Sequence, residues 1–93
     1  MDSIVVETPL GNLIAYPSGD PDYPGIWIDL RRKGCDINCG LTLVEVTKTE
    51  ADLSDEESHV ITRVWENAME AEYADRIVHR EIEEYFREAA ENE

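Results

Sequence analysis

Residues 20–30 read Asp20-Pro21-Asp22-Tyr23-Pro24-Gly25-Ile26-Trp27-Ile28-Asp29-Leu30, a stretch in which a proline-rich turn runs directly into an alternating segment. Each proline fixes its own φ near about −65° and moves the preceding residue out of the helical region, which predicts a tight loop. Pro24-Gly25 suits the central positions of a type II turn because glycine accepts positive φ. From Ile26 onward apolar residues recur at every second position, which predicts a strand with one buried face.

Two strands are expected before this stretch, and the strand that starts within it is followed by a fourth. Residues 3–8 are rich in β-branched side chains, and Thr8-Pro9-Leu10-Gly11 is typical of a type I turn. Residues 13–16 should therefore return as the second strand of a hairpin. Residues 25–32 form the third strand, and residues 41–48, with apolar side chains on both faces, form an interior fourth strand.

Residues 58–66 are compatible with two structures. Four β-branched residues within His59–Trp65 favour a fifth strand. Val60, Ile61, Val64, Trp65 and Ala68 also fit the apolar stripe of a helix, and Ser54-x-x-Glu57 matches a capping box. Periodicity alone leaves both structures open.

The C-terminal segment predicts one helix over about residues 76–90. Asp75 can cap its start, and an apolar stripe runs along one side, formed by Val78, Ile82, Tyr85, Phe86 and Ala89. We therefore predict a single small α+β domain over residues 1–93, with a mostly antiparallel sheet of four or five strands in meander order within residues 3–66 and one C-terminal helix packed on it. The predicted core consists of Ile28, Leu43, Val44, Val46, Val64, Ile82 and Phe86.

The chain is strongly acidic, and its charge is uneven. The net charge of the 93 residues is −14; residues 1–49 hold 7 acids and 4 bases, whereas residues 50–93 hold 15 acids and 4 bases. Such a field repels nucleic acids and anionic lipids and attracts basic protein surfaces, so we expect no direct nucleic-acid or membrane binding. A bland alternative is that the acidity only keeps the protein soluble. Because no long apolar run and no secretory signal is visible, we predict a cytoplasmic location.

Neither metal chemistry nor catalysis is predicted. Cys35 and Cys39 are expected to be reduced thiols, and the set that they make with His59 and His79 matches no zinc-site spacing. The sequence contains no nucleophile motif and no glycine-rich phosphate loop. We therefore predict no cofactor, no metal and no enzymatic activity.

Four short motifs resemble those of a family of short acidic proteins of Gram-positive bacteria and their phages. They are the run of residues 20–28, Leu43-Val44-Glu45-Val46, Val64-Trp65 and Glu72-Tyr73, and the resemblance covers about residues 11–80. The resemblance implies that Val64-Trp65 ends a strand before an acidic loop. The family has no established activity, so the resemblance supplies no catalytic residues. It implies a phage or mobile-element setting, in which a protein that blocks a host defence system is expected.

The functional hypothesis is a small acidic protein-interaction module that binds a basic surface of a partner protein, and its sharper version is a DNA-mimic inhibitor. The expected contact residues are Glu50, Asp52, Asp55, Glu56, Glu57, Glu81, Glu84 and Glu88, together with Asp20, Asp22, Tyr23 and Trp27 of the turn and strand. One alternative is a binder of a small molecule or nucleotide signal that stacks on Tyr23, Trp27 and Trp65. Another is a structural homo-oligomer that pairs through an edge strand or the C-terminal helix.

Overall fold

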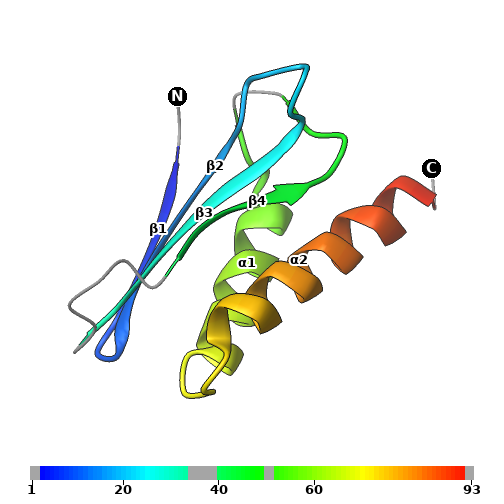
Figure 1. The fold of residues 1–93 in the computed structure, drawn as a ribbon. Helices are drawn as coiled ribbons and strands as arrows, with labels where there is room; N and C mark the ends of the chain where they lie inside the picture. Colours follow the sequence, from blue (N-terminus) through cyan, green and yellow to red (C-terminus); the bar gives the residue numbers. More distant parts are fainter. Residues whose placement is uncertain (1–2, 34–39, 50–51, 92–93) are drawn as a thin grey trace.

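Four strands and two helices make up the part of the chain that the structure describes. The structure is a computed structural model that describes residues 3–33, 40–49 and 52–91. Its elements are β1 (Ile4–Thr8), β2 (Gly11–Pro17), β3 (Gly25–Arg32), β4 (Gly40–Glu45), α1 (Asp55–Ala68) and α2 (Ala74–Glu91). The strands form one antiparallel sheet in chain order, and both helices lie on the same side of it (Figure 1). The predicted α+β class and the meander order are confirmed.

The hairpin between β1 and β2 forms where the sequence predicts it. Thr8 pairs with Gly11, so Pro9 and Leu10 are the two residues of the loop. The Thr8 hydroxyl donates to the Gly11 carbonyl at 2.7 Å and accepts from the Gly11 N–H at 3.2 Å. These two bonds satisfy backbone groups at the end of the hairpin.

The hydrogen-bonded turn is centred three residues earlier than the sequence suggested. The Tyr23 N–H donates to the Asp20 carbonyl at 3.1 Å, and the Asp20 carboxylate accepts from the Asp22 N–H at 2.9 Å. Pro21 and Asp22 therefore occupy the central positions of the turn, and the prediction of a Pro24-Gly25 type II turn is wrong. Gly25 instead begins β3.

The core lies between one face of the sheet and the two helices. Strand register places Leu13 opposite Leu30, and Ile28 opposite Ala15, so that their side chains alternate onto the inner face. The fully buried large side chains come from both layers: Leu13, Ile26, Ile28, Leu30, Val44, Ile61, Trp65, Val78 and Ile82. At one end the Arg32 guanidinium donates to the Ala71 carbonyl at 2.9 Å, which joins β3 to the connection between α1 and α2.

Residues 58–66 form part of a helix, so the predicted fifth strand and the prediction of a single C-terminal helix are both wrong. The sheet accordingly ends at Glu45 and does not extend to residue 66. Ser54 accepts from the Glu57 N–H at 3.2 Å, and Glu57 accepts from the Ser54 N–H at 2.8 Å, which completes the capping box. The reading of Val64-Trp65 as the end of a strand is overturned as well.

The helix is favoured by burial over β propensity. Val60, Ile61, Val64, Trp65 and Ala68 are the buried residues of α1. Each β-branched residue costs a helix less than about 0.7 kcal/mol, whereas burying one large apolar side chain contributes about 1.5–3 kcal/mol. Burial of the apolar side chains therefore outweighs their low helix propensity, and the segment forms an amphipathic helix.

The predicted core is correct for Ile28, Val44, Val64 and Ile82. The remaining members, Leu43, Val46 and Phe86, are only partly buried. All three lie near the end of β4, where α2 runs past the sheet, and they line a surface groove.

Candidate functional site

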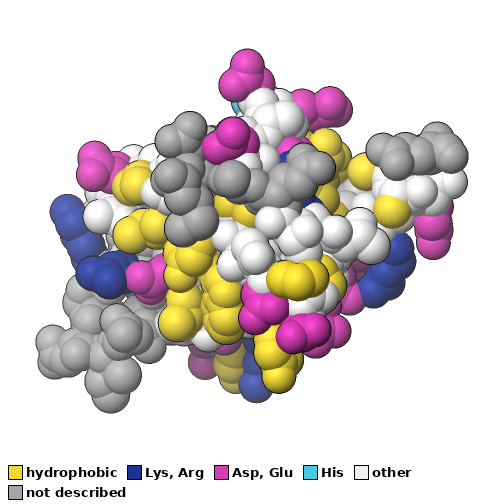
Figure 2. All heavy atoms as spheres, turned by 90° about the horizontal axis from the view of Figure 1, so that it is seen from above, with side chains coloured by type: hydrophobic (Ala, Val, Ile, Leu, Met, Phe, Trp, Pro, Cys, Tyr) yellow, Lys and Arg dark blue, Asp and Glu magenta, His cyan; other side chains and the backbone are white. Residues whose placement is uncertain are grey.

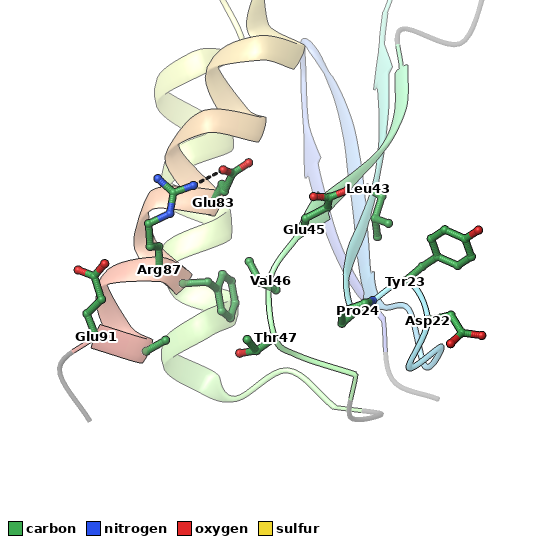
Figure 3. A pocket seen from close by; sticks show the side chains of 12 residues that line it. Asp22, Tyr23, Pro24, Leu43, Glu45, Val46, Thr47, Glu83, Arg87 and Glu91 are labelled. Atoms are coloured by element: carbon green, nitrogen blue, oxygen red, sulfur yellow. Dashed lines mark hydrogen bonds and ion pairs between the residues drawn. The ribbon is translucent and has the colours of Figure 1, made fainter.

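A groove of about 580 Å³ lies where the proline turn, the end of β4 and the C-terminal half of α2 meet (Figure 3). The groove is bordered by the turn residues Asp22, Tyr23 and Pro24, by Leu43, Glu45, Val46 and Thr47, and by the helix residues Glu83, Phe86, Arg87, Ala90 and Glu91. Concave sites of roughly 300–1,000 Å³ are the size that small ligands and short peptide segments occupy.

Lys48, in the segment after β4, joins two neighbouring elements next to the groove. Its carbonyl accepts from the Gly25 N–H at 2.9 Å, and its ammonium lies 2.9 Å from the Glu57 carboxylate. Both charged side chains are largely buried, with 18% and 15% of their surface exposed. The start of β3, the segment after β4 and the start of α1 are thus held in one arrangement.

The proline turn is fixed by its own hydrogen bonds. The Ser18 hydroxyl donates to the Tyr23 carbonyl at 2.8 Å, and the Ser18 N–H donates to the Gly25 carbonyl at 2.9 Å. Tyr23 is nevertheless 65% exposed. The turn therefore presents an aromatic side chain from a rigid backbone, at low cost in conformational entropy.

The middle of the groove is apolar. Val46 lies between Pro24 of the turn and α2 (Figure 3), and Phe86 of α2 lines the same groove. Phe86 is held edge-on against Tyr85, with ring centroids 5.2 Å apart and planes at 83°. Such an aromatic pair contributes about 0.5–1.5 kcal/mol beyond the area that it buries. The groove thus has a preformed hydrophobic floor.

The rim of the groove is acidic. Four carboxylates lie along it, those of Asp22, Glu45, Glu83 and Glu91, against one guanidinium, that of Arg87. Arg87 forms an ion pair with Glu83 one helical turn away, as the i,i+4 spacing allows. The rim therefore carries three more negative than positive charges.

His79 connects this rim to the edge of the sheet. Its Nε2 lies 3.2 Å from the carbonyl oxygen of Leu43, and its Nδ1 lies 3.7 Å from the Glu83 carboxylate. With the Nε2 proton in place, the ring donates to a β4 carbonyl that faces away from β3. In this way α2 covers part of the edge strand, which otherwise offers backbone groups for pairing with another chain.

The predicted acids of α2 lie on its other flank. At about 100° per residue, Glu81 and Glu88 fall on the side of the helix turned away from the groove, with Glu84 next to them. Burial raises the pKa of Tyr85, and the charges of Glu56 and Glu57 at the start of α1 raise it further. The acids at the start of α1 therefore act on Tyr85 of α2.

Glu57 has a structural role in addition to its charge. Burial alone would raise the pKa of its carboxyl, but the hydrogen bond from Lys48 and those from Ser54 outweigh burial and hold the pKa below its ordinary value. This carboxylate is committed to Lys48 and to the helix cap. Asp55 and Glu56 in the same turn, and Asp52 before it, are exposed.

The remaining predicted site residues are dispersed. Asp22 and Tyr23 line the groove, whereas Asp20 closes the turn behind them. Trp27 lies on the outer face of the sheet, paired with Tyr16 and Leu43. Glu50, Cys35 and Cys39 lie outside the described residues.

The sequence interpretation missed Glu45, Glu91 and Phe86 as groove residues. The i,i+4 spacing of Glu83 and Arg87 was visible in the sequence and marks the side of α2 that faces the groove. The place of Glu45 and Glu91 depends on how the helix crosses β4, which no local pattern reports.

Within residues 3–33, 40–49 and 52–91, His, Cys, Asp and Glu side chains form no group of three that could hold a metal ion. Over the same residues, neither helix combines the length and apolarity needed to cross a membrane. Comparison of the chain with models of protein families, with curated proteins and with solved structures found no match.

Proposed function

We propose that this protein is an acidic interaction module whose groove binds a basic segment of a partner protein. The observation that carries the proposal is the combination of a hydrophobic floor with an acidic rim, formed where the proline turn meets α2. The preferred segment carries Lys or Arg side chains on both sides of an apolar or aromatic one. The apolar side chain fills the space beside Val46 and Phe86, and the cations lie against the rim.

The charge of the whole molecule supports the same partner. A net charge of −14 attracts a basic protein from a distance and accelerates encounter. Exposed ion pairs contribute little affinity, about 0.2–1 kcal/mol each, so charge alone does not hold the partner in one orientation. The floor of the groove supplies the apolar contact that fixes the bound segment.

DNA mimicry is the sharper version of this proposal. Glu81, Glu84, Glu88 and Glu91 lie within eleven residues of α2, about 15 Å from first to last, which gives one charge per roughly 4–5 Å. Duplex DNA carries one charge per about 1.7 Å of its axis. A mimic would therefore need the acids of α1 as well, and it predicts that duplex DNA competes with this protein for its partner.

The direct test uses a short labelled peptide of alternating arginine and leucine as the probe, with fluorescence anisotropy as the readout. A triple variant, Asp22→Asn, Glu45→Gln and Glu91→Gln, neutralises three exposed acids of the rim. We expect binding to weaken about tenfold, because three exposed pairs at roughly 0.5 kcal/mol each amount to about 1.4 kcal/mol. Raising salt to about 0.5 M should weaken wild-type binding as well.

A matched control removes the same number of charges elsewhere. Glu66, Glu70 and Glu72 are exposed near the connection between the helices, and their joint change to Gln should leave the affinity within about twofold. A peptide of alternating arginine and glycine carries the same charge without the apolar side chains and should bind more weakly than the leucine peptide. Equal losses in the two triple variants, or equal affinities for the two peptides, would show that the groove is not the site.

A further inference from the structure

The outer face of the sheet is unusually apolar for a face that no helix of the described chain covers. Because successive side chains point to opposite faces, the residues between the buried positions of each strand lie on this side. Its large apolar side chains are Val5, Ile14, Tyr16, Trp27, Leu41 and Leu43. Val5 and Leu41 are 54% and 58% exposed.

These side chains form two adjacent rows across the strands. In one row Tyr16 pairs with Trp27, and Trp27 pairs with Leu43. In the other row the pairing runs from Val5 through Ile14 and Asp29 to Leu41. Contiguous exposed apolar patches on soluble proteins mark interaction sites, whereas single exposed side chains do not.

The charged groups of this face are few and partly paired. Arg31 and Asp29 form an ion pair at 3.2 Å, and Asp29 is the less exposed partner. Glu7 and Glu45 lie toward opposite ends of the face. The face is therefore close to neutral in its middle, which does not select a strongly basic partner.

Charge is also segregated between the two layers. Residues 1–49, which supply the sheet, carry a net charge of −3, whereas residues 50–93, which supply the helices, carry −11. If two sheets pack face to face, their spacing is about 10 Å, and each helix layer lies roughly another 10 Å beyond its sheet. The two helix layers are then about 30 Å apart, several Debye lengths at physiological salt.

We propose that the outer face of the sheet binds a second copy of this chain, sheet against sheet, with the acidic helices turned outward. This arrangement covers the two apolar rows and keeps the two strongest negative fields as far apart as the molecule permits. The face measures roughly 20 by 20 Å, from four strands about 4.8 Å apart and five to eight residues long. Stable interfaces bury about 800 Å² per partner, about twice the area of this face. We therefore expect a weak dimer, with a Kd in the micromolar range or above.

The outer face shares Leu43 and Glu45 with the groove, but binding there responds to salt in the opposite way. Higher salt screens the repulsion between two acidic chains and leaves apolar contacts intact, so it should strengthen the dimer. The same change weakens binding of a basic segment in the groove. Salt dependence therefore separates the two.

The test is analytical ultracentrifugation of the full chain from about 5 to about 500 µM, at about 0.15 and 0.5 M salt. We expect a monomer–dimer equilibrium that shifts toward dimer with concentration and with salt. Leu41→Glu places a charge in the apolar patch at an exposed position and should raise the dimer Kd at least tenfold. Leu10→Glu makes the same change in the β1–β2 loop, where the side chain is 42% exposed, and should leave the Kd unchanged.

Three results would overturn the proposal. The wild-type chain stays monomeric over the whole range, in which case a different partner covers the face. The dimer persists in Leu41→Glu, which places the interface elsewhere. Or Leu10→Glu disrupts the dimer as strongly as Leu41→Glu, which shows that association is not specific to the sheet. Circular dichroism of both variants confirms that each one is folded before its Kd is compared.

Discussion

Gly25 joins the proline turn to the sheet through two backbone hydrogen bonds. Its N–H donates to the Lys48 carbonyl at 2.9 Å, and its carbonyl accepts from the Ser18 N–H at the same distance. A Cβ at this position would lie 2.3 Å from the carbonyl oxygen of Val44. The backbone of β4 approaches so closely that no larger residue fits without moving a strand.

At the scale of the residue, we therefore expect Gly25→Ala to cost about 2–3 kcal/mol of stability, because the clash is with backbone and not with a side chain that can rotate. Urea unfolding measures this as a lower midpoint at an unchanged slope. Gly19→Ala is the comparison, since its φ of 70° is strained for alanine but the space around it is open. Its cost should be only about 1 kcal/mol. Equal costs at the two positions would mean that the close approach of β3 and β4 is not rigid.

The sequence predicted that residues 20–25 form a loop but placed the turn within it at the wrong residues. Two prolines and a glycine predict a loop because they restrict φ, and the loop is present. The hydrogen-bonded turn falls on Pro21-Asp22 because the Asp20 side chain also accepts from the Asp22 N–H, and because Gly25 is needed inside the strand. The second requirement is a tertiary contact with β4, which residues 20–30 do not contain.

At the scale of the element, α1 depends on the residues before it. Its capping box involves Ser54 and Glu57, and Glu57 also pairs with Lys48. The pKa of the Glu57 carboxyl is held below its ordinary value. A carboxyl with a lowered folded pKa contributes stability above the unfolded pKa of about 4.3, and that contribution is lost as the pH falls through the folded pKa.

We expect Glu57→Gln to remove this contribution. Glutamine can complete the capping box, so the cap is kept while the charge that pairs with Lys48 is lost. The variant should be less stable than the wild type at pH 7, and the difference should shrink as the pH falls below about 4.3. Thermal unfolding over the acid range measures it. Glu56→Gln removes the same charge from an exposed neighbour and should show a smaller pH-dependent difference.

The identity of α1 was within reach of the sequence. As a strand, residues 58–66 would place Arg63 between Ile61 and Trp65 on one face, which leaves a charge in the apolar row. As a helix, the same residues separate the apolar stripe from Arg63, and the stripe continues to Ala68. The β-branched residues made the strand attractive, but propensity is a weak effect beside burial. The capping box was the correct signal.

The candidate site was less predictable than the elements. Asp22 and Tyr23 were identified because their turn is a local feature. Glu45, Phe86 and Glu91 come from distant parts of the chain, and only the crossing of α2 over β4 brings them to the same groove. The predicted acids Glu81 and Glu88 belong to the same helix but lie on its other flank. Acidic composition alone could not show which acids of α2 border the groove.

At the scale of the whole molecule, charge and apolar surface are arranged on different sides. The helices and their connections carry most of the −14 charge, and the outer face of the sheet carries the two apolar rows, in which Val5 and Leu41 are exposed. Seen from above, hydrophobic side chains gather near the middle of the molecule, and acidic side chains lie at several places around them (Figure 2). Two kinds of contact are therefore expected, one with a basic segment and one with a second copy.

The central claim is that the groove is where a basic segment binds, and backbone amide shift mapping tests it most directly. The ¹⁵N-labelled protein is titrated with the arginine–leucine peptide at a protein concentration low enough to keep it monomeric. We expect the largest shifts on Tyr23, Val46, Thr47, Phe86 and Ala90, and we expect about tenfold more peptide to be needed for the same shifts in the variant Asp22→Asn, Glu45→Gln, Glu91→Gln. Shifts confined to the flank of Glu81, Glu84 and Glu88, or shifts that follow only the charge of the peptide, would contradict it.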